Sequence, residues 1–329
     1  MKNIIVTTLC FLALFFGGMW VASAQHNGNS SGKNEDNSGE GYNASISPWA
    51  RKGFEFSFGG GIYFGSKKTA NYYNGAPENN INLKLLTDNE YRWMEVINVL
   101  KNKYHYIDEE NVKLREDYNY ESHYNIAMDI AVALKYRFQK NYYFELAYSF
   151  RRLTASNHFV FDFPRVPPSN IEKPYSKNYS RPEGIVARED RHYIDFSVGY
   201  IFQKHPIAKP FVALGVQFTY IRIKDFKAVI EGEVYDLMDA ARYPNYIPGV
   251  QEMPKYIDWA GAGYGFLFTA GLKIAFHPAV SLDPIFQLSV ASFGNSQANL
   301  PGFYTKLCCN YVAGIRLVLN DALFMRKDR

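Results

Sequence analysis

The sequence is poor in cysteine, carries little net charge and has almost no long hydrophobic run. Only three of its 329 residues are cysteines, and two of them, Cys308 and Cys309, are adjacent. Neighbouring side chains in a strand point to opposite faces, so these two are badly placed to bond to each other, and no disulfide framework is expected. The formal net charge of +4 is too small to indicate a nucleic-acid partner.

The one long apolar stretch lies at the N-terminus. Lys2 is followed by apolar residues over 4–21, and an A-x-A cleavage site comes directly before Gln25. This arrangement predicts a cleaved Sec signal peptide over 1–24 and therefore export; the alternative is an uncleaved membrane helix. No later segment approaches the roughly 18 unbroken apolar residues of a membrane helix.

The signal is followed by a polar segment. Residues 25–52 are rich in Asn, Gly and Ser, and such a segment cannot bury enough surface to offset the entropy lost on ordering. We therefore expect a flexible periplasmic leader over 25–52. The remaining sequence is predicted to form one domain over 53–319 and a short C-terminal tail over 320–329.

That domain is dominated by alternation of apolar and polar residues. Over 126–138 large apolar residues occupy every second position, and the residues between them are small or charged. Side chains alternate across a β-strand, so this is a strand with one apolar and one polar face. The pattern recurs and predicts eight strands, at 53–65, 126–138, 142–153, 191–202, 210–223, 263–276, 280–293 and 306–319.

The connections between these strands alternate in length. Short turns follow the second, fourth and sixth strands, whereas long loops span 66–123, 154–190 and 224–262, with a shorter one over 294–305. Short turns at one end and long loops at the other are typical of an up-and-down barrel in an outer membrane. The sequence thus predicts an all-β, eight-stranded antiparallel transmembrane β-barrel, with both chain ends on the short-turn side.

Volume decides which face of the strands lies inside. A soluble lipocalin-like barrel would turn the apolar face inward, and a membrane barrel would turn it outward. The interior of eight strands is just wide enough for side chains to fill, so it cannot hold about forty large apolar residues. The aromatic content of 17% also suits the aromatic girdles of a membrane barrel.

The polar face then lines the lumen. It carries five acids and five bases, and buried charge is tolerated when it is paired. We expect an ion-paired plug; the alternative is a proton or ion path, or a gated pore. The predicted network comprises Glu55, Asp129, Lys135, Arg137, Glu145, Arg151, Asp195, Lys273, Asp283 and Arg316.

The strand pattern and loop asymmetry over 53–319 resemble the small bacterial outer-membrane barrels, the OmpA/OmpX-like porin-family domain. The resemblance implies the outer membrane of a Gram-negative bacterium, surrounding lipid and lipopolysaccharide, and insertion by the barrel-assembly machinery. Many members end on an aromatic residue, but this chain continues past its last predicted strand. The candidate insertion signals are Leu317, Leu319 and Phe324.

Catalytic and metal-binding patterns are sparse. Some small barrels of this type modify lipid A, which needs a nucleophile and a nearby base, and Ser156 and His158 are the best local pair. The competing interpretation is that both lie on an ordinary polar loop. His105, His123 and His192 lack metal-ligand spacing, so no metal or other cofactor is expected.

The first long loop contains a helical pattern. A capping box over 87–90 precedes apolar residues at helical spacing. Trp93, Ile97, Leu100 and Tyr104 could form a binding surface, or they could pack against the barrel rim or another loop. A second short helix is expected over 234–241.

Together these observations favour a non-enzymatic barrel with a structural, adhesion or envelope-assembly role. That role would be carried by the surface loops toward an unidentified surface or envelope partner. The alternatives are a lipid A-modifying barrel enzyme, such as an acyl hydrolase, and a narrow pore.

Overall fold

The structure is a computed structural model that describes residues 52–104, 112–115, 121–163, 179–203, 208–257, 259–277, 279–293 and 307–320. The predicted signal peptide over 1–24, the predicted leader up to residue 51 and the tail beyond residue 320 lie outside these ranges. The compact unit described below falls within 46–329.

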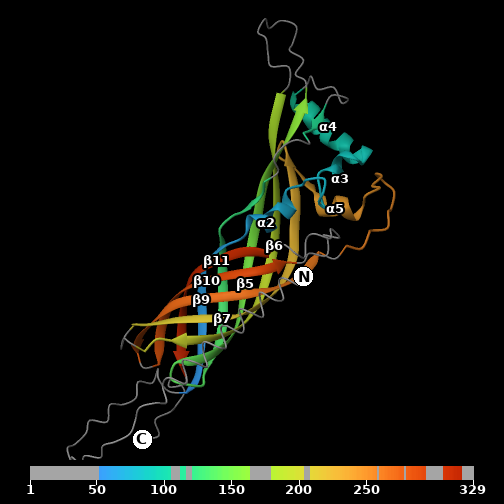
Figure 1. Cartoon of the computed structure of the whole chain (residues 1–329). Helices are drawn as coiled ribbons and strands as arrows, with labels where there is room; N and C mark the ends of the chain where they lie inside the picture. Colours follow the sequence, from blue (N-terminus) through green and yellow to red (C-terminus); the bar gives the residue numbers. More distant parts are fainter. Residues whose placement is uncertain are drawn as a thin grey trace, which may run out of the picture. The chain divides into compact units, whose positions relative to one another are not determined.

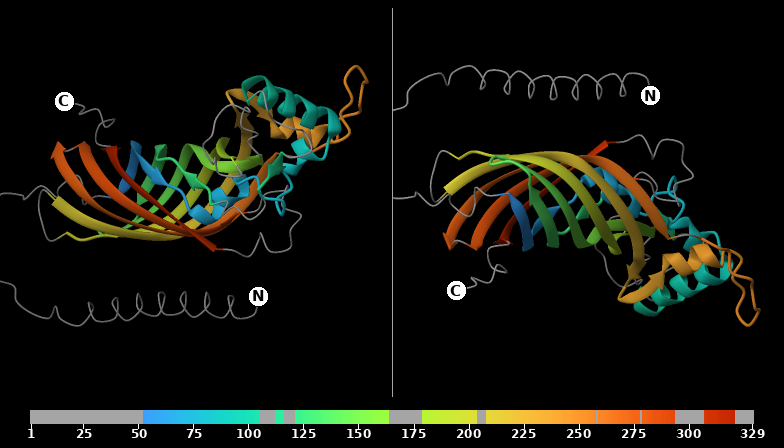
Figure 2. Two further views of the ribbon diagram at one scale, coloured as in Figure 1. Left: turned by 90° about the horizontal axis from the view of Figure 1, so that it is seen from above. Right: turned by 90° about the horizontal axis from the view of Figure 1, so that it is seen from below.

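Eight strands of the described residues close into a ring. Each pairs antiparallel with its neighbours, in the order β5-β4-β1-β11-β10-β9-β7-β6, and β6 pairs back with β5. The predicted eight-stranded up-and-down barrel is confirmed, and Figures 1 and 2 show its curved wall. The strands are β1 (Gly53–Phe64), β4 (Ala127–Arg137), β5 (Tyr142–Phe163), β6 (Tyr179–Ile201), β7 (Ala208–Ile230), β9 (Ala260–His277), β10 (Val280–Phe293) and β11 (Leu307–Asn320).

The two faces of the barrel wall differ as the alternation predicts. Outward side chains such as Phe58 and Met128 are 57% and 76% exposed, whereas inward Glu55 and Asp129 are buried. Exposed apolar side chains occur on all eight strands. This belt excludes the lipocalin-like alternative, because such a surface is stable in lipid and not in water.

Three strands extend far beyond their predicted bounds. β5 continues to Phe163, β6 begins at Tyr179 and β7 runs to Ile230, so much of the sequence assigned to loops is strand. Alternation persists there, but the polarity of the two faces is reversed: the outward face carries Arg152 and Arg188, and the inward face becomes apolar. A register shift between Arg188 and Glu189 in the β6–β7 ladder marks this change.

Short strands and helices lie at the end of the barrel that carries the long loops. β2 (Lys113–Leu114) and β3 (His123–Tyr124) pair with β5, and β8 (Glu233–Asp236) pairs with β7. The helices are α2 (Lys67–Ala70), the 3₁₀ turn η2 (Asn71–Tyr73), α3 (Lys84–Thr87), α4 (Glu90–Tyr104) and α5 (Leu237–Arg242). None of the helices in the described ranges is long and apolar enough to cross a bilayer.

The predicted helix of the first loop is confirmed as α4, but its cap is different. Asn89, not Thr87, caps the helix: its Oδ1 accepts the backbone N–H of Arg92 at 3.1 Å. Thr87 is instead the last residue of α3. The second predicted helix exists as α5, shifted toward the C-terminus and capped by Asp236.

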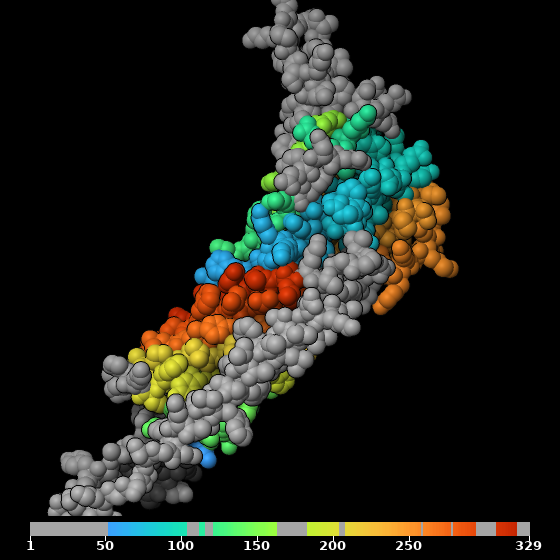
Figure 3. Space-filling model, in the orientation of Figure 1, coloured from blue at the N-terminus to red at the C-terminus, as the bar shows by residue number. Residues whose placement is uncertain are grey.

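We call the region beyond the belt the cap: α3, α4, α5 and the parts of β5, β6 and β7 beyond Leu153, Glu189 and Ile223. Its inward strand face packs against the helices in one hydrophobic cluster. Figures 1 and 3 show these helices against the ends of the long strands. Among the most deeply buried members are Phe159, Ile185, Phe226 and Ile230 from the strands, and Val96, Ile97, Leu100, Leu237 and Ala240 from the helices.

The barrel wall generates a test of close strand packing. A Cβ added to the lumen-side Gly215 would overlap the carbonyl oxygen of Phe196 and the Cα of Ser197. Gly215→Ala should therefore destabilise the barrel by about 1–3 kcal/mol, measured by urea unfolding in detergent micelles. Gly60→Ala is the matched control, because a Cβ there points outward and comes no nearer than 3.6 Å to Asp129 O. Equal midpoints for both variants would contradict this packing.

Candidate functional site in the lumen and at its mouth

The first lumen cluster joins the neighbouring strands β1 and β4 to β9, which is separated from β1 by β11 and β10. The Glu55 carboxylate on β1 accepts a hydrogen bond from Arg137 Nη2 on β4 at 2.5 Å and from Lys273 Nζ on β9 at 2.6 Å. All three side chains are buried. One acid therefore pairs with two bases drawn from distant parts of the sequence.

A second cluster is built in the same way around Glu145 on β5. Arg316 of β11 donates to Glu145 at 2.6 Å, and the Lys135 ammonium lies 3.5 Å away. The Lys135 charge also lies over the rings of Tyr143 and Phe211, at 4.5 and 5.1 Å from their centroids. Aromatic faces thus share the stabilisation of a buried cation.

Arg151 forms the third cluster. Its Nε donates to Asp129 at 2.5 Å, and one Nη donates to Gln287 of β10 at 3.3 Å. The guanidinium also lies over the rings of Tyr63 and Tyr193, at 4.5 and 4.0 Å. The planar guanidinium is thereby held by hydrogen bonds along its edge and by cation–π contacts on its faces.

Two of the ten predicted residues have neutral partners instead of bases. Asp195 accepts from Gln217 Nε2 at 2.8 Å and from Gln287 Nε2 at 3.2 Å. Asp283 accepts from Ser281 Oγ at 2.9 Å. The other eight residues form ion pairs with one another. Equal numbers of acids and bases on one face of the strands therefore do not determine which side chains come close enough to form ion pairs.

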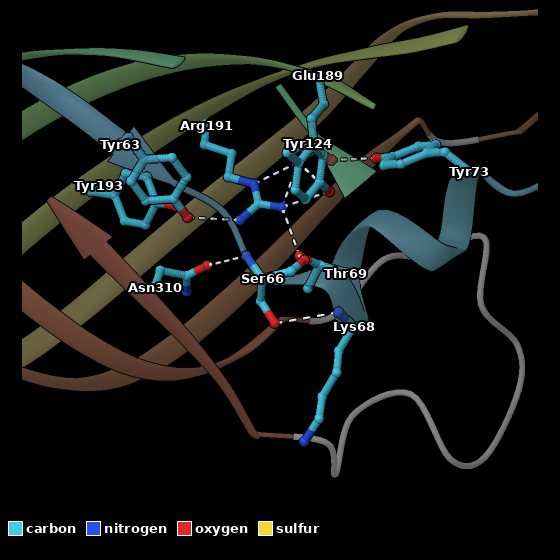
Figure 4. Close-up of polar contacts among 10 residues, drawn as sticks. All are labelled: Tyr63, Ser66, Lys68, Thr69, Tyr73, Tyr124, Glu189, Arg191, Tyr193 and Asn310. Atoms are coloured by element: carbon cyan, nitrogen blue, oxygen red, sulfur yellow. Dashed lines mark hydrogen bonds and ion pairs between the residues drawn. The ribbon is translucent and has the colours of Figure 1, made fainter. Parts of the chain in front are cut away.

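A further cluster at the mouth of the barrel was missed from the sequence. Buried Arg191 donates from Nε to Glu189 Oε1 at 2.6 Å, and its Nη groups donate to Tyr124, Tyr63 and Thr69 at 2.8, 3.2 and 3.3 Å (Figure 4). Glu189 also accepts from the hydroxyl groups of Tyr73 and Tyr124. This cluster ties α2, η2 and β3 to the barrel wall.

The signal for this cluster was present in the sequence. The alternation of inward and outward side chains runs back from Tyr193 through Arg191 to Glu189. The predicted strand over 191–202 stops short of Glu189, which falls in the predicted loop over 154–190. Lys209, placed in a turn, is also a buried lumen residue and lies directly across from Lys273. Extending each strand until its polarity changes includes Glu189 and Lys209 as well.

The tyrosines of the mouth cluster act as donors. Burial, together with the Glu189 charge, raises the pKa of Tyr73 well above its ordinary value. Burial and Glu189 likewise raise the pKa of Tyr124. Both phenols therefore keep their protons at physiological pH and donate to the carboxylate.

The lumen is filled by these groups. Side chains that are less than 2% exposed include Arg137, Arg151, Arg191, Lys273, Tyr63, Tyr143 and Tyr193. Large charged and aromatic side chains with mutual hydrogen bonds leave the interior packed. The arrangement suits a structural plug.

The weak catalytic candidates are not on a loop. Ser156 and His158 lie on the outward face of β5, two residues apart. Ser156 is opposite His123 of β3 and Val186 of β6, and His158 is opposite Gly184. These direct cross-strand partners include no carboxylate to orient a histidine. Within the described ranges, no group of three or more His, Cys, Asp or Glu side chains could hold a metal ion.

The proposed loop surface is largely internal. Ile97 and Leu100 are fully buried in the cap cluster, and the Trp93 ring lies 5.9 Å from that of Phe161. The Tyr104 side chain lies outside the described residues. The apolar face of α4 therefore packs on the long strands through Ile97, Leu100 and Trp93.

A closed ring of eight strands, an apolar belt outside and paired charges inside define a transmembrane β-barrel. This is the all-β, eight-stranded antiparallel transmembrane barrel that the strand pattern predicts.

No protein-family model matches the chain, and no curated protein matches it. Solved structures with a similar strand arrangement include Neisserial surface protein A (8% identity, TM-score 0.35, covering 81% of this chain and 95% of that one). A second is Ail of Yersinia pestis in complex with the heparin analogue sucrose octasulfate (8% identity, TM-score 0.31, covering 81% of this chain and 99% of that one). A third is OprG of Pseudomonas aeruginosa (9% identity, TM-score 0.31, covering 83% of this chain and 96% of that one). The architecture is established by the strand pairings and the belt, since these likenesses are distant.

The Glu55 cluster generates a prediction about buried charge. Glu55→Gln leaves Arg137 and Lys273 without their anion, so the barrel should lose about 3–5 kcal/mol in urea unfolding. Glu121→Gln is the control: its ion pair with Lys67 has the same 2.6 Å length but is solvent-exposed, so its loss should leave the midpoint unchanged. Similar losses in both variants would contradict the assigned importance of lumen pairing.

Proposed function

We propose that this protein is a non-enzymatic outer-membrane barrel that presents its cap to a partner, in adhesion or envelope assembly. The observation that carries the proposal is the cap itself. Three strands continue out of the belt and are covered by helices in a fully buried core. A barrel that served only as a membrane anchor would not need such a folded structure beyond the bilayer.

The proposal includes an orientation. The turns that join β4 to β5, β6 to β7 and β9 to β10 are short, and β1 begins and β11 ends at the same end of the barrel, opposite the cap. In an outer-membrane barrel the short turns face the periplasm and the long loops face outward. Export by the signal peptide, insertion by the barrel-assembly machinery and a Gram-negative outer membrane with lipopolysaccharide belong to this proposal.

The loop that follows α5 adds an exposed surface to the cap, and this surface suits binding. In the loop over 243–257, Met253 and Tyr256 are 91% and 90% exposed, and Val250 is also exposed. Asn89 Nδ2 at the start of α4 donates to the backbone of this loop, at 3.2 Å to Pro244 O and 3.0 Å to Tyr246 O. Large apolar side chains on an anchored loop can bury much area at little entropic cost.

The first experiment tests the rival activities. The purified protein should give no sustained conductance in planar bilayers, because its lumen is filled with paired side chains. It should also release no acyl chains from lipid A vesicles, followed by mass spectrometry. Stable conductance steps, or acyl release that Ser156→Ala or His158→Ala abolishes, would overturn the proposal.

The second experiment tests the cap. Cells that display the protein should adhere to at least one surface in a panel of immobilised extracellular and envelope proteins and glycans. The variant Val250→Ser/Met253→Ser/Tyr256→Ser should reduce that adhesion to background, since these side chains are exposed and their loss leaves the core intact. Phe58→Ser/Phe266→Ser, which changes the belt, is not expected to affect binding in correctly inserted protein. No adhesion by wild-type cells would count against the proposal.

A further inference from the structure

Basic side chains gather on the outer face of the barrel just beyond the apolar belt. We call Arg152 of β5, Arg188 of β6, and Arg222 and Lys224 of β7 the basic band. Arg152 and Arg188 are 58% and 50% exposed at their side chains, and Arg222 and Lys224 are exposed as well. These positions come from three neighbouring strands, so they form a continuous surface.

The strand register places the band in rows. Arg152, Asp190 and Arg222 lie directly across from one another on the three strands. In the next row, Arg188 is directly across from Asp225. The first row therefore alternates base, acid and base around the wall, with its cations on either side of one carboxylate.

The band directly follows the belt. Phe150, His192 and Tyr220 form the last row of the belt and precede the first basic row by two residues on each strand, about 7 Å. From His192 down to Phe202 the strand advances about 25 Å along the membrane normal at a typical tilt, which equals the height of an apolar belt. The basic band therefore lies at the level of the lipid headgroups on the cap side.

The acidic residues of this surface form ion pairs with the bases but are too few to neutralise all of them. Arg152 binds Asp190 through two hydrogen bonds, at 2.8 and 3.2 Å, and Lys224 lies 3.7 Å from the same carboxylate. Arg188 pairs with Asp225 at 3.4 Å, as does Lys227 at 3.2 Å.

The remaining neighbours do not reverse this charge. On β8, Asp236 lies across from Lys227 and accepts the backbone N–H groups of Met238 and Asp239. Even with Asp236 counted, bases exceed acids by two among the described residues of this face. On the β9 side, Arg222 lies across from the uncharged Ala260.

We propose that the basic band binds the phosphate groups of anionic lipid headgroups in the leaflet on the cap side. Guanidinium groups match phosphate oxygens with two parallel hydrogen bonds, and each base near an anionic membrane surface adds to the attraction. A lipid headgroup is the best-placed phosphate, because its acyl chains can lie on the belt directly below the band. The inference rests on the transmembrane barrel and does not depend on what the cap binds.

The test uses the full protein in phosphatidylcholine nanodiscs that contain a minor fraction of either bisphosphorylated or dephosphorylated lipid A. After exchange into detergent, the lipid that remains bound is measured by mass spectrometry. Wild type should retain the phosphorylated lipid at least about tenfold over the dephosphorylated one at low salt. Arg152→Gln/Arg222→Gln/Lys224→Gln should remove most of that preference.

The controls separate phosphate binding from folding. Lys52→Gln/Lys140→Gln/Lys255→Gln changes three exposed bases away from the band and should keep the preference. Arg152→Lys/Arg222→Lys preserves the charge and should keep most of it, with heat-modifiable migration reporting the fold. Equal retention of both lipids by wild type, or an unchanged preference in a folded glutamine variant, would overturn the inference. Neither result would bear on adhesion by the cap.

Discussion

The pairing of β1 with β11 is the constraint on which the rest of the structure depends. In lipid every backbone N–H and C=O must find a partner within the protein, and an open sheet edge would leave a row of them without one. The ladder from Glu55–Asn320 to Phe64–Tyr311 closes that edge. Closure with eight strands makes the lumen narrow, and a narrow lumen requires its charged side chains to find ion-pair or hydrogen-bond partners among one another and their neutral neighbours.

The polarity of the wall then follows from the surroundings of each part. Within the bilayer the outer face is apolar and the inner face is polar, as Phe196 and Asp195 illustrate on β6. Beyond it the faces exchange character on the same strand, where Arg188 is exposed and Ile185 is buried. The Arg191–Glu189 cluster lies at this transition, where the polar lumen below meets the apolar cap core above. Polar contacts to loop tyrosines suit that boundary.

The barrel could be predicted from the sequence because lipid imposes one rule along every strand. The bounds of β1, β10 and β11 differ from the predicted ones by no more than a residue or so. Prediction fails where the surroundings change, as in β5 beyond Leu153, because the outer face there is polar and no longer follows the apolar-outward pattern that marks the other strands. The pairing of individual lumen side chains could not be predicted either. Glu55 and Lys273 are 218 residues apart, and the alternation of faces does not reveal which strands meet across a lumen. The helical period of α4 was visible, but not the surface against which it packs.

The continuity of the long strands has a mechanical consequence. β5, β6 and β7 pass from the membrane into the cap with pairing maintained throughout, including across the register shift near Arg188. A pull on the cap along these strands therefore loads many backbone hydrogen bonds in parallel, in shear, and no single loop carries it. The strands deliver that load to a wall that surrounding lipid and the β1–β11 ladder hold closed. The long strands therefore give the cap mechanical resistance along their own direction.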